Sequence, residues 1–397
     1  MVSFQEARQL VLAQARSFGT EDRELGDASG RVLAGQVRAD RDYPPFPRAT
    51  MDGYALRFDD LERGIRRFRV VEVLFAGAQP VAPVESGECY KIMTGASVPK
   101  EANIVIRRED VQEDGVEVEV GARDPEPWRP FLNIARQGED LRRGDVVIGK
   151  PCRCTAPVMG LLATLGCASV KVARLPRVAL VTTGDEVVDP GSPVGAVQIR
   201  NSNHYMLQSA LLREGITPVG SAHSPDQPDA LTATLQDFSG FDVLITTGGV
   251  SAGDADHVPQ VLERLGVRRL FHKVAMRPGK PGYCGILPGG GIVFGLPGNP
   301  FSCLVHFALM IGPYLQACQG LDPASPVGVP ISAGRVKRTA FDEFFPVFIG
   351  GSPVVAVPVV LNGSGDIRLG REANALARHA ADAAELTAGT ITECYWM

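Results

Sequence analysis

Three glycine-containing loops carry the residue types best suited to hold a phosphorylated ligand. Each follows an apolar run typical of a buried strand, and they span residues 182–186, 246–256 and 296–300. Glycine lets a backbone approach a ligand closely, and N–H groups at the start of a helix attract anions. A lone Gly-Gly turn is usually structural. Three such loops in one domain, each with polar side chains, indicate a binding site at the carboxyl ends of the strands.

Two cations lie in a segment stiffened by prolines. Arg277 and Lys280 belong to the run 276–282, which contains Pro278 and Pro281. Rigidly held cations suit phosphate or another tetrahedral oxyanion. The alternative is an exposed turn without a ligand.

Acidic residues gather at the expected ends of strands and helices: Asp185, Glu186, Asp226, Asp254 and Asp256. Mg²⁺ prefers oxygen ligands and usually takes only one or two carboxylates beside a substrate phosphate. Helix capping is the competing interpretation, for Asp226 before one helix and for Asp254 or Asp256 before another.

The overall charge excludes some classes of function. Among 397 residues the formal net charge is -5, which argues against general nucleic-acid binding. The start of the chain lacks a basic segment followed by an apolar one, and we find no uninterrupted apolar stretch of about 18 residues. We therefore expect a cytoplasmic protein without a membrane span. Eight scattered cysteines are expected to be reduced thiols.

The elements that must position these loops follow from hydrophobic patterning. Apolar runs at 178–181, 242–245 and 291–294 alternate with helical patterns at 205–212, 258–265 and 302–315. This alternation predicts a parallel sheet covered on both faces by helices. Strand-like runs at 68–75, 103–106 and 115–120 predict a separate small β domain, and the run at 354–361 a final one. Ser3 and Glu6 form a capping box that starts a helix near Phe4.

Short motifs, taken together and in order, resemble the MoeA family of molybdopterin molybdenumtransferases, which includes the gephyrin E domain. The matching segments are 49–55, 92–96, 138–140, 183–186, 198–203, 248–251, 278–281 and 296–300. The resemblance implies a multidomain α/β plus β protein with a central three-layer α/β/α molybdopterin-binding domain at 177–320. It implies a helical linker domain (1–45 and 142–176) and two smaller β domains (46–141 and 327–397). It also implies an elongated homodimer whose active cleft joins the α/β domain of one subunit to N-terminal parts of the other.

The reaction implied by the resemblance inserts molybdenum from molybdate into adenylylated molybdopterin, with Mg²⁺-dependent hydrolysis of the adenylate and release of AMP. Lys280 and Arg277 would hold phosphate or molybdate, and Glu186 and Asp256 are the candidates for binding Mg²⁺ or orienting water. The catalytic candidates are Asp52, Asp140, Glu186, Asp226, Asp256 and Lys280. The substrate-binding candidates are Thr94, Thr183, Gly184, Asp185, Gly248, Gly249, Ser251, Arg277, Pro297, Asn299 and Pro300.

The C-terminal region departs from the family pattern. Residues 339–346 stand where relatives tend to carry a basic stretch, and Asp366 stands where an apolar residue is common. These departures argue against substrate contacts from this domain and do not affect the core chemistry, so the role of the domain stays open. Two other functions stay open: a molybdopterin adenylyltransferase or another nucleotide-dependent phosphate-transfer enzyme, and a non-catalytic cofactor-binding scaffold. The resemblance also allows a transient contact with the molybdopterin adenylyltransferase.

Overall fold

The computed structural model describes residues 1–121, 128–251, 257–337, 339–368 and 370–397. Contacts between Cα atoms divide the chain into two compact units. The first unit comprises Met1–Ala34, Pro151–Val158 and Ser169–Met397, and the second comprises Gly35–Lys150 and Met159–Ala168.

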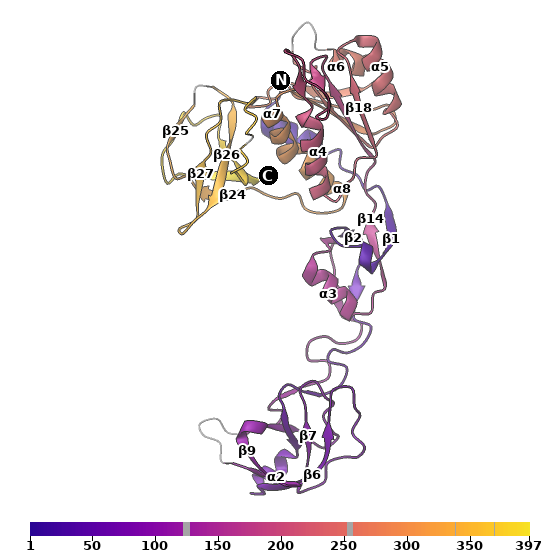
Figure 1. Ribbon diagram of the computed structural model, residues 1–397, viewed down its shortest axis with the longest axis vertical. Helices are drawn as coiled ribbons and strands as arrows, with labels where there is room; N and C mark the ends of the chain where they lie inside the picture. The colour runs from indigo at the N-terminus through magenta and orange to yellow at the C-terminus, as the bar shows by residue number, and fades with distance from the viewer. Residues whose placement is uncertain (122–127, 252–256, 338, 369) are drawn as a thin grey trace. The chain divides into compact units, whose positions relative to one another are not determined.

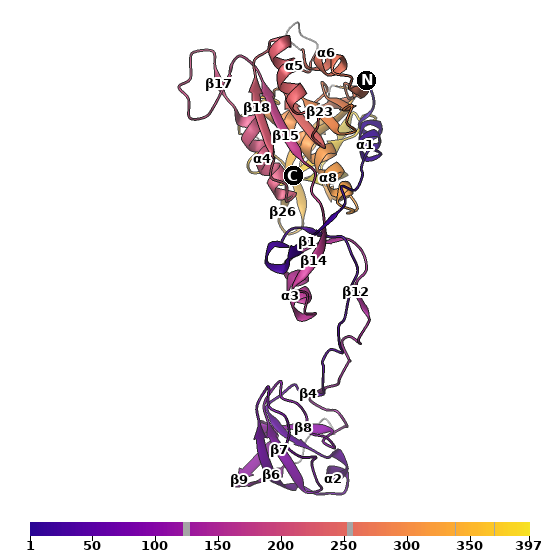
Figure 2. The same cartoon turned by 90° about the vertical axis from the view of Figure 1, so that its right-hand side faces the viewer.

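A six-stranded sheet lies at the centre of the first unit (Figure 2). Its order is β18 (Gly220–Ser224), β15 (Val178–Thr183), β19 (Val243–Thr247), β23 (Ile292–Leu296), β22 (Tyr283–Ile286), β20 (Arg268–His272). The first four strands are parallel, which confirms the prediction for the three strands that precede the glycine loops. β22 and β20 are antiparallel additions that the prediction missed. The short turn 287–291 allows only an antiparallel return between β22 and β23.

Helices cover both faces of this sheet. Val178 and Leu180 of β15 belong to one apolar cluster, whereas Ala179 and Val181 belong to another. The first cluster contains residues of α4 (Ser202–Arg213), α7 (Pro300–His306) and α8 (Gly312–Cys318), and the second those of α5 (Pro228–Asp237) and α6 (Val258–Arg264). Alternation of side chains along a strand places successive residues on opposite faces. The strand interior is therefore buried on both sides.

The helix expected at 302–315 differs in detail. It begins at Pro300, and a π-helical segment (Phe307–Ile311) separates α7 from α8. The stretch Pro300–Cys318 passes a test of length and composition for crossing a membrane, although Ser302, His306 and Gln316 interrupt it, and 78% of its 18-residue apolar window is buried inside the structure. Its apolar character is accounted for by the core that it fills.

A mainly antiparallel sheet forms the C-terminal part of the first unit (Figure 1, orange to yellow). Its order is β21 (Met276–Arg277), β26 (Asp342–Gly350), β28 (Ala375–His379), β30 (Ile391–Trp396), β24 (Val327–Pro330), with β27 (Val355–Pro358) paired to β26. β21 comes from the cationic segment and pairs in parallel with β26, so that Arg277 lies opposite Glu343. The prediction of strands in this region is confirmed, although β27 covers only part of 354–361. A small pair joins β25 (Arg335–Val336) to β29 (Glu385–Leu386).

The remaining elements of the first unit are short. Helix α1 (Phe4–Leu12) begins at Ser3, whose hydroxyl accepts the N–H of Glu6 at 3.1 Å, as the capping box predicts. The ring of Phe4 packs edge-on against Phe344, with centroids 4.8 Å apart. The other strands are β1 (Thr20–Glu24), β14 (Ser169–Ala173), β2 (Val32–Leu33) and β13 (Cys152–Arg153), which form one sheet, and the pair β16 (Val187–Val188) and β17 (Ile199–Arg200). A 3-10 turn spans Leu25–Asp27. Helix α3 spans Ala156–Thr164, of which residues 156–158 belong to this unit and residues 159–164 to the second.

The second unit contains its own six-stranded sheet. The order is β8 (Ile104–Arg107), β5 (Gly53–Leu56), β7 (Glu88–Ile92), β6 (Arg67–Leu74), β10 (Glu117–Val120), β9 (Val111–Asp114). The strand predictions at 68–75, 103–106 and 115–120 are thus confirmed to within two residues. Two short pairs accompany the sheet, β4 (Arg48–Ala49) with β11 (Ile134–Ala135) and β3 (Val37–Arg38) with β12 (Val146–Ile148), together with helix α2 (Phe58–Glu62) and a 3-10 turn (Arg108–Asp110).

Candidate functional site

A cavity of about 820 Å³ opens at the carboxyl ends of β15, β19 and β23. The strands are parallel, so their following loops meet at one edge of the sheet. Most of the residues predicted for this edge do line the cavity: Thr183, Gly184, Glu186, Asp226, Gly248, Gly249, Ser251, Pro297, Asn299 and Pro300. The structure therefore brings the three predicted glycine loops into one site.

Glycine is required where two of these loops touch. Gly248 has φ +93°, and a Cβ there would lie 2.5 Å from the hydroxyl oxygen of Thr183. Gly249 also has positive φ, at +61°. Any side chain at Gly248 would force the loop after β19 away from the loop after β15. The two loops can therefore pack against each other where both line the cavity.

Two asparagines at the start of α4 brace these loops. The amide of Asn201 donates to the Thr182 hydroxyl oxygen at 2.9 Å, and the amide of Asn203 donates to the carbonyl of Gly298 at 2.7 Å. Thr182 in turn contacts a ring nitrogen of His223 at 3.0 Å. Segment 198–203 was recognised in the sequence as a family motif, but no role could be given to it. Its role is to tie the ends of β15 and β23 to one helix.

Three carboxylates gather at the ends of β15 and β18. Asp185 accepts the backbone N–H of Asp226 at 3.2 Å. Burial, together with the nearby charges of Glu186 and Asp185, raises the pKa of Asp226. The hypothesis that Asp226 caps a helix is wrong, because α5 begins after Gln227 and has no side-chain cap. The carboxylate of Asp226 instead lines the cavity.

The donor set fits a magnesium ion that shares its ligands with a phosphate. Within the described ranges no group of three or more His, Cys, Asp or Glu side chains is arranged to hold a metal by itself. Two carboxylates, Glu186 and Asp226, do line one cavity. Mg²⁺ commonly binds through one or two carboxylates and completes its shell with phosphate and water oxygens. Asp254 and Asp256 lie outside the residues that the structure describes.

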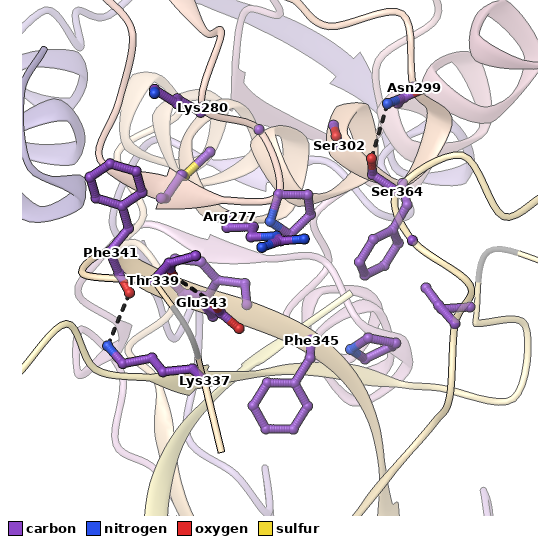
Figure 3. Close-up of a pocket in the computed structure, with 18 of the residues that line it drawn as sticks. Arg277, Lys280, Asn299, Ser302, Lys337, Thr339, Phe341, Glu343, Phe345 and Ser364 are labelled. Atoms are coloured by element: carbon purple, nitrogen blue, oxygen red, sulfur yellow. Dashed lines mark hydrogen bonds between the residues drawn. The ribbon is translucent and has the colours of Figure 1, made fainter. Parts of the chain in front are cut away.

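A second cavity, of about 960 Å³, lies between the segment 276–281 and the C-terminal sheet (Figure 3). Arg277 and Lys280 line it, as do Arg335, Lys337 and Glu343. The C-terminal domain therefore forms one wall of the cavity, which the sequence did not lead us to expect. Pro281, Pro297 and Asn299 line both cavities, so the two adjoin.

Three of the charged side chains in the second cavity already have hydrogen-bond partners within its wall. An Arg335 guanidinium nitrogen lies 2.6 Å from a carboxylate oxygen of Glu343, whose other oxygen accepts the hydroxyl of Thr339 at 2.6 Å. Although burial acts in the opposite direction, the hydrogen bonds from Thr339 and Arg335 lower the pKa of Glu343. Lys337 donates to the carbonyl oxygens of Phe341 and Ala380.

Arg277 and Lys280 are the cations left for a ligand. In the part of the chain that the structure describes, neither forms a hydrogen bond or an ion pair through its side chain, and both are exposed. The ammonium of Lys280 lies 5.4 Å from the centre of the Phe341 ring. The charge of Arg277 also helps to lower the pKa of Glu343, which lies opposite it in the sheet. With Lys280 it gives the cavity a local positive charge, which favours an oxyanion in a protein whose net charge is negative.

The other predicted residues belong to the second unit. One carboxylate oxygen of Asp52 accepts both the backbone N–H and the hydroxyl of Thr94, each at 2.7 Å. The hydrogen bond from the Thr94 side chain lowers the pKa of Asp52. Asp140 is exposed in another loop of this unit, where its backbone N–H donates to Tyr43 at 3.0 Å. The structure thus unites Asp52 with Thr94.

Most of the chain is similar to known proteins. Residues 2–166 match the MoeA N-terminal region (domain I and II), and residues 179–317 match a probable molybdopterin binding domain. A molybdopterin molybdenumtransferase of Synechococcus elongatus is 37% identical over 87% of each chain, and one of Synechocystis sp. is 32% identical over 92% of each. The chain belongs to the MoeA family.

A crystal structure of the molybdopterin biosynthesis MoeA protein of Pyrococcus horikoshii covers all of both chains with a TM-score of 0.85 and 27% identity. A second, at 30% identity, gives 0.81 and covers 100% of this chain and 99% of that one. The MoeA-like mixed α/β fold is therefore shared over the full length.

Proposed function

We propose that this MoeA-family protein is a molybdopterin molybdenumtransferase that inserts molybdenum into adenylylated molybdopterin and releases AMP. The names of its curated relatives support the activity. One observation carries the proposal further: Pro281, Pro297 and Asn299 line both the glycine-loop cavity and the cationic cavity. A phosphorylated ligand in the first cavity would therefore lie beside an oxyanion in the second.

The glycine-loop cavity suits the phosphoadenylate part of the substrate. Loop N–H groups near Gly248 and Gly249 would approach the phosphate oxygens closely. Glu186 and Asp226 would hold Mg²⁺ there. When bound, Mg²⁺ neutralises charge on the phosphate oxygens as the bond to AMP breaks. Asp226 would hold the cation near the loop after β18, whose backbone is hydrogen-bonded to Asp185.

The cationic cavity suits molybdate. Arg277 and Lys280 have exposed side chains without a hydrogen-bond partner among the described residues, whereas Arg335 and Glu343 form an ion pair and Lys337 donates to backbone carbonyls. These two cations would hold the oxyanion next to Asn299 at the junction of the cavities. Oxyanion and acceptor ligand would then meet without diffusion through solvent.

We further propose that the enzyme works as a homodimer with a site shared between subunits. Asp52 and Thr94 form a ready-made acidic site in the second unit, and they would complete the cavity of the other subunit together with Asp140. In this arrangement Asp52 stays ionised because Thr94 donates two hydrogen bonds to it.

The test is an assay with purified protein, adenylylated molybdopterin, molybdate and Mg²⁺. AMP release that depends on molybdate is the expected result. Turnover of ATP with unmodified molybdopterin would favour an adenylyltransferase instead, and binding of the pterin without AMP release would favour a scaffold.

A further inference from the structure

A histidine buried in the core lies directly against the cationic loop. His306, near the end of α7, is 3% exposed. Its Nε2 atom lies 2.7 Å from the carbonyl oxygen of Gly279. Gly279 is located between Arg277 and Lys280, so the histidine contacts the backbone that carries both of these exposed cations.

The loop lies against the imidazole ring at two places. A Cβ at Gly279 would lie 2.8 Å from Nε2, and a Cβ at Gly282 would lie 2.3 Å from Cε1 of the same ring. Contacts that short do not occur between real atoms, so only glycine fits at either position unless the loop moves. The ring therefore fixes how closely the loop approaches α7.

The chemistry of the contact defines its hydrogen bond. A carbonyl oxygen can only accept, so Nε2 must carry the proton. Complete burial lowers the pKa of His306 to about 4, and the ring is therefore neutral near pH 7. The contact is a neutral N–H to carbonyl bond, which positions the loop without adding charge to it.

A histidine is an unusual residue at a position that only fills the apolar core. The neighbouring buried positions of the same helical stretch, Cys303, Val305 and Phe307, are weakly polar or apolar. A polar ring in such surroundings costs stability unless it is hydrogen-bonded. The bond that His306 forms is directed to the carbonyl between the two cations, and not to its own helix. This direction indicates a role in the loop.

We propose that His306 is a positioning residue that sets the placement of Arg277 and Lys280 and thereby the affinity for the oxyanion. The inference rests on the proposed function in one respect, namely that these two cations bind molybdate. Loss of the N–H donor would let the loop shift relative to Asn299 and the adjoining cavity. The adenylate end of the substrate, which the glycine loops hold, would be unaffected.

The test compares His306→Leu with His306→Gln. Leucine removes the donor, whereas the glutamine amide can still donate to a carbonyl. Molybdate binding to the full chain is measured by calorimetry without pterin, and KM values for molybdate and adenylylated molybdopterin are measured in turnover. We expect His306→Leu to raise the Kd and the KM for molybdate about tenfold, the typical effect of one lost hydrogen bond. We expect His306→Gln to stay within about threefold of the wild type, and the KM for the pterin to be unchanged in both.

Two further variants keep the test decisive. Leu309→Ala removes a fully buried side chain from the same helical stretch and should lower Tm without changing the Kd for molybdate. Gly282→Ala leaves the histidine in place but pushes the loop off the ring, and it should weaken molybdate binding selectively. If His306→Leu does not fold, the molybdate affinity of Gly282→Ala is measured in its place.

Unchanged molybdate affinity in a folded His306→Leu or Gly282→Ala protein would overturn the inference. Molybdate binding that depends on His306, in a protein without molybdate-dependent AMP release, would instead refute the proposed function alone.

Discussion

The backbone N–H of Asp226 donates to the carboxylate of Asp185 at 3.2 Å and so joins the loop after β18 to the loop after β15. This bond brings the Asp226 carboxyl group close to the negative charges of Asp185 and Glu186. Burial and those charges raise its pKa. A site that concentrates negative charge in this way has most to gain from binding a cation.

Replacement of Asp226 by asparagine should therefore weaken the use of Mg²⁺. We expect the Mg²⁺ concentration for half-maximal AMP release to rise about tenfold, because one of two carboxylate ligands is lost. Titration of Mg²⁺ in the AMP assay measures the effect. Asp229→Asn is the matched control, since it removes an exposed acid from the first turn of α5. An equal shift in both variants would contradict a role of Asp226 in the site.

The same residue should determine the acidic limb of the pH profile. Only the ionised carboxylate binds Mg²⁺, and a raised pKa means that Asp226 takes up its proton at a higher pH than an ordinary aspartate. Activity should accordingly fall on acidification above the usual aspartate range of about 4, and extra Mg²⁺ should move the limb to lower pH. A limb that does not respond to Mg²⁺ would exclude this explanation.

Thr94 should control the charge of Asp52. Thr94→Val keeps the shape of the side chain and removes the hydroxyl that donates at 2.7 Å. The pKa of Asp52 should rise, and turnover should drop about tenfold, while Thr94→Ser should keep most of the activity. NMR titration of the Asp52 carboxyl carbon gives the pKa directly. A normal rate in Thr94→Val would show that this hydrogen bond is dispensable.

Mixing two impaired variants tests the shared site, with the assay run at limiting Mg²⁺, where Asp226→Asn is expected to be nearly inactive. Asp52→Asn and Asp226→Asn each place the defect in a different unit of the chain. If a site combines units from two subunits, random mixed dimers contain one intact site, and activity returns to about a quarter of the wild type. Each variant refolded alone is the control. If both units act within one chain, mixing will restore nothing.

His306 should also affect how the free energy of unfolding depends on pH. Its pKa is about 4 in the folded protein, compared with 6.5 as the ordinary value. Between these pH values the unfolded chain binds a proton that the folded chain does not, so the free energy of unfolding falls as pH is lowered from 6.5 to 4. The full difference is about 3 kcal/mol. Denaturant unfolding of His306→Gln should show a flatter acid slope by up to that amount, and equal slopes would contradict the burial of a neutral ring.

Local sequence rules predicted the glycine-loop cavity well. Apolar runs before Gly184, Gly248 and Gly298 defined buried strands, and parallel strands must bring their following loops to one edge. Only one side of the cationic cavity could be predicted from the sequence. Arg277 and Lys280 were visible because prolines flank them, but the wall made by Arg335, Lys337 and Glu343 depends on the pairing of β21 with β26. Such pairing joins segments far apart in the chain, and no local pattern encodes it.

The side chains that hold the loops of the site in place could not be predicted from the sequence for a related reason. Asn203 and His306 each bind a backbone carbonyl of a loop that is distant in sequence. A carbonyl acceptor has no side-chain signature, so neither partner can be recognised from the sequence. His306 was concealed further by its apolar neighbours, which are typical of a core helix.

A single-turnover measurement that counts both products tests the proposed molybdenum insertion most directly. Protein, adenylylated molybdopterin, Mg²⁺ and molybdate are mixed, and AMP released and molybdenum bound to the pterin are quantified in the same sample. We predict one molybdenum inserted for each AMP, no AMP without molybdate, and loss of both in Lys280→Met at limiting molybdate. AMP release without molybdate insertion, or insertion that leaves the adenylate intact, would contradict it.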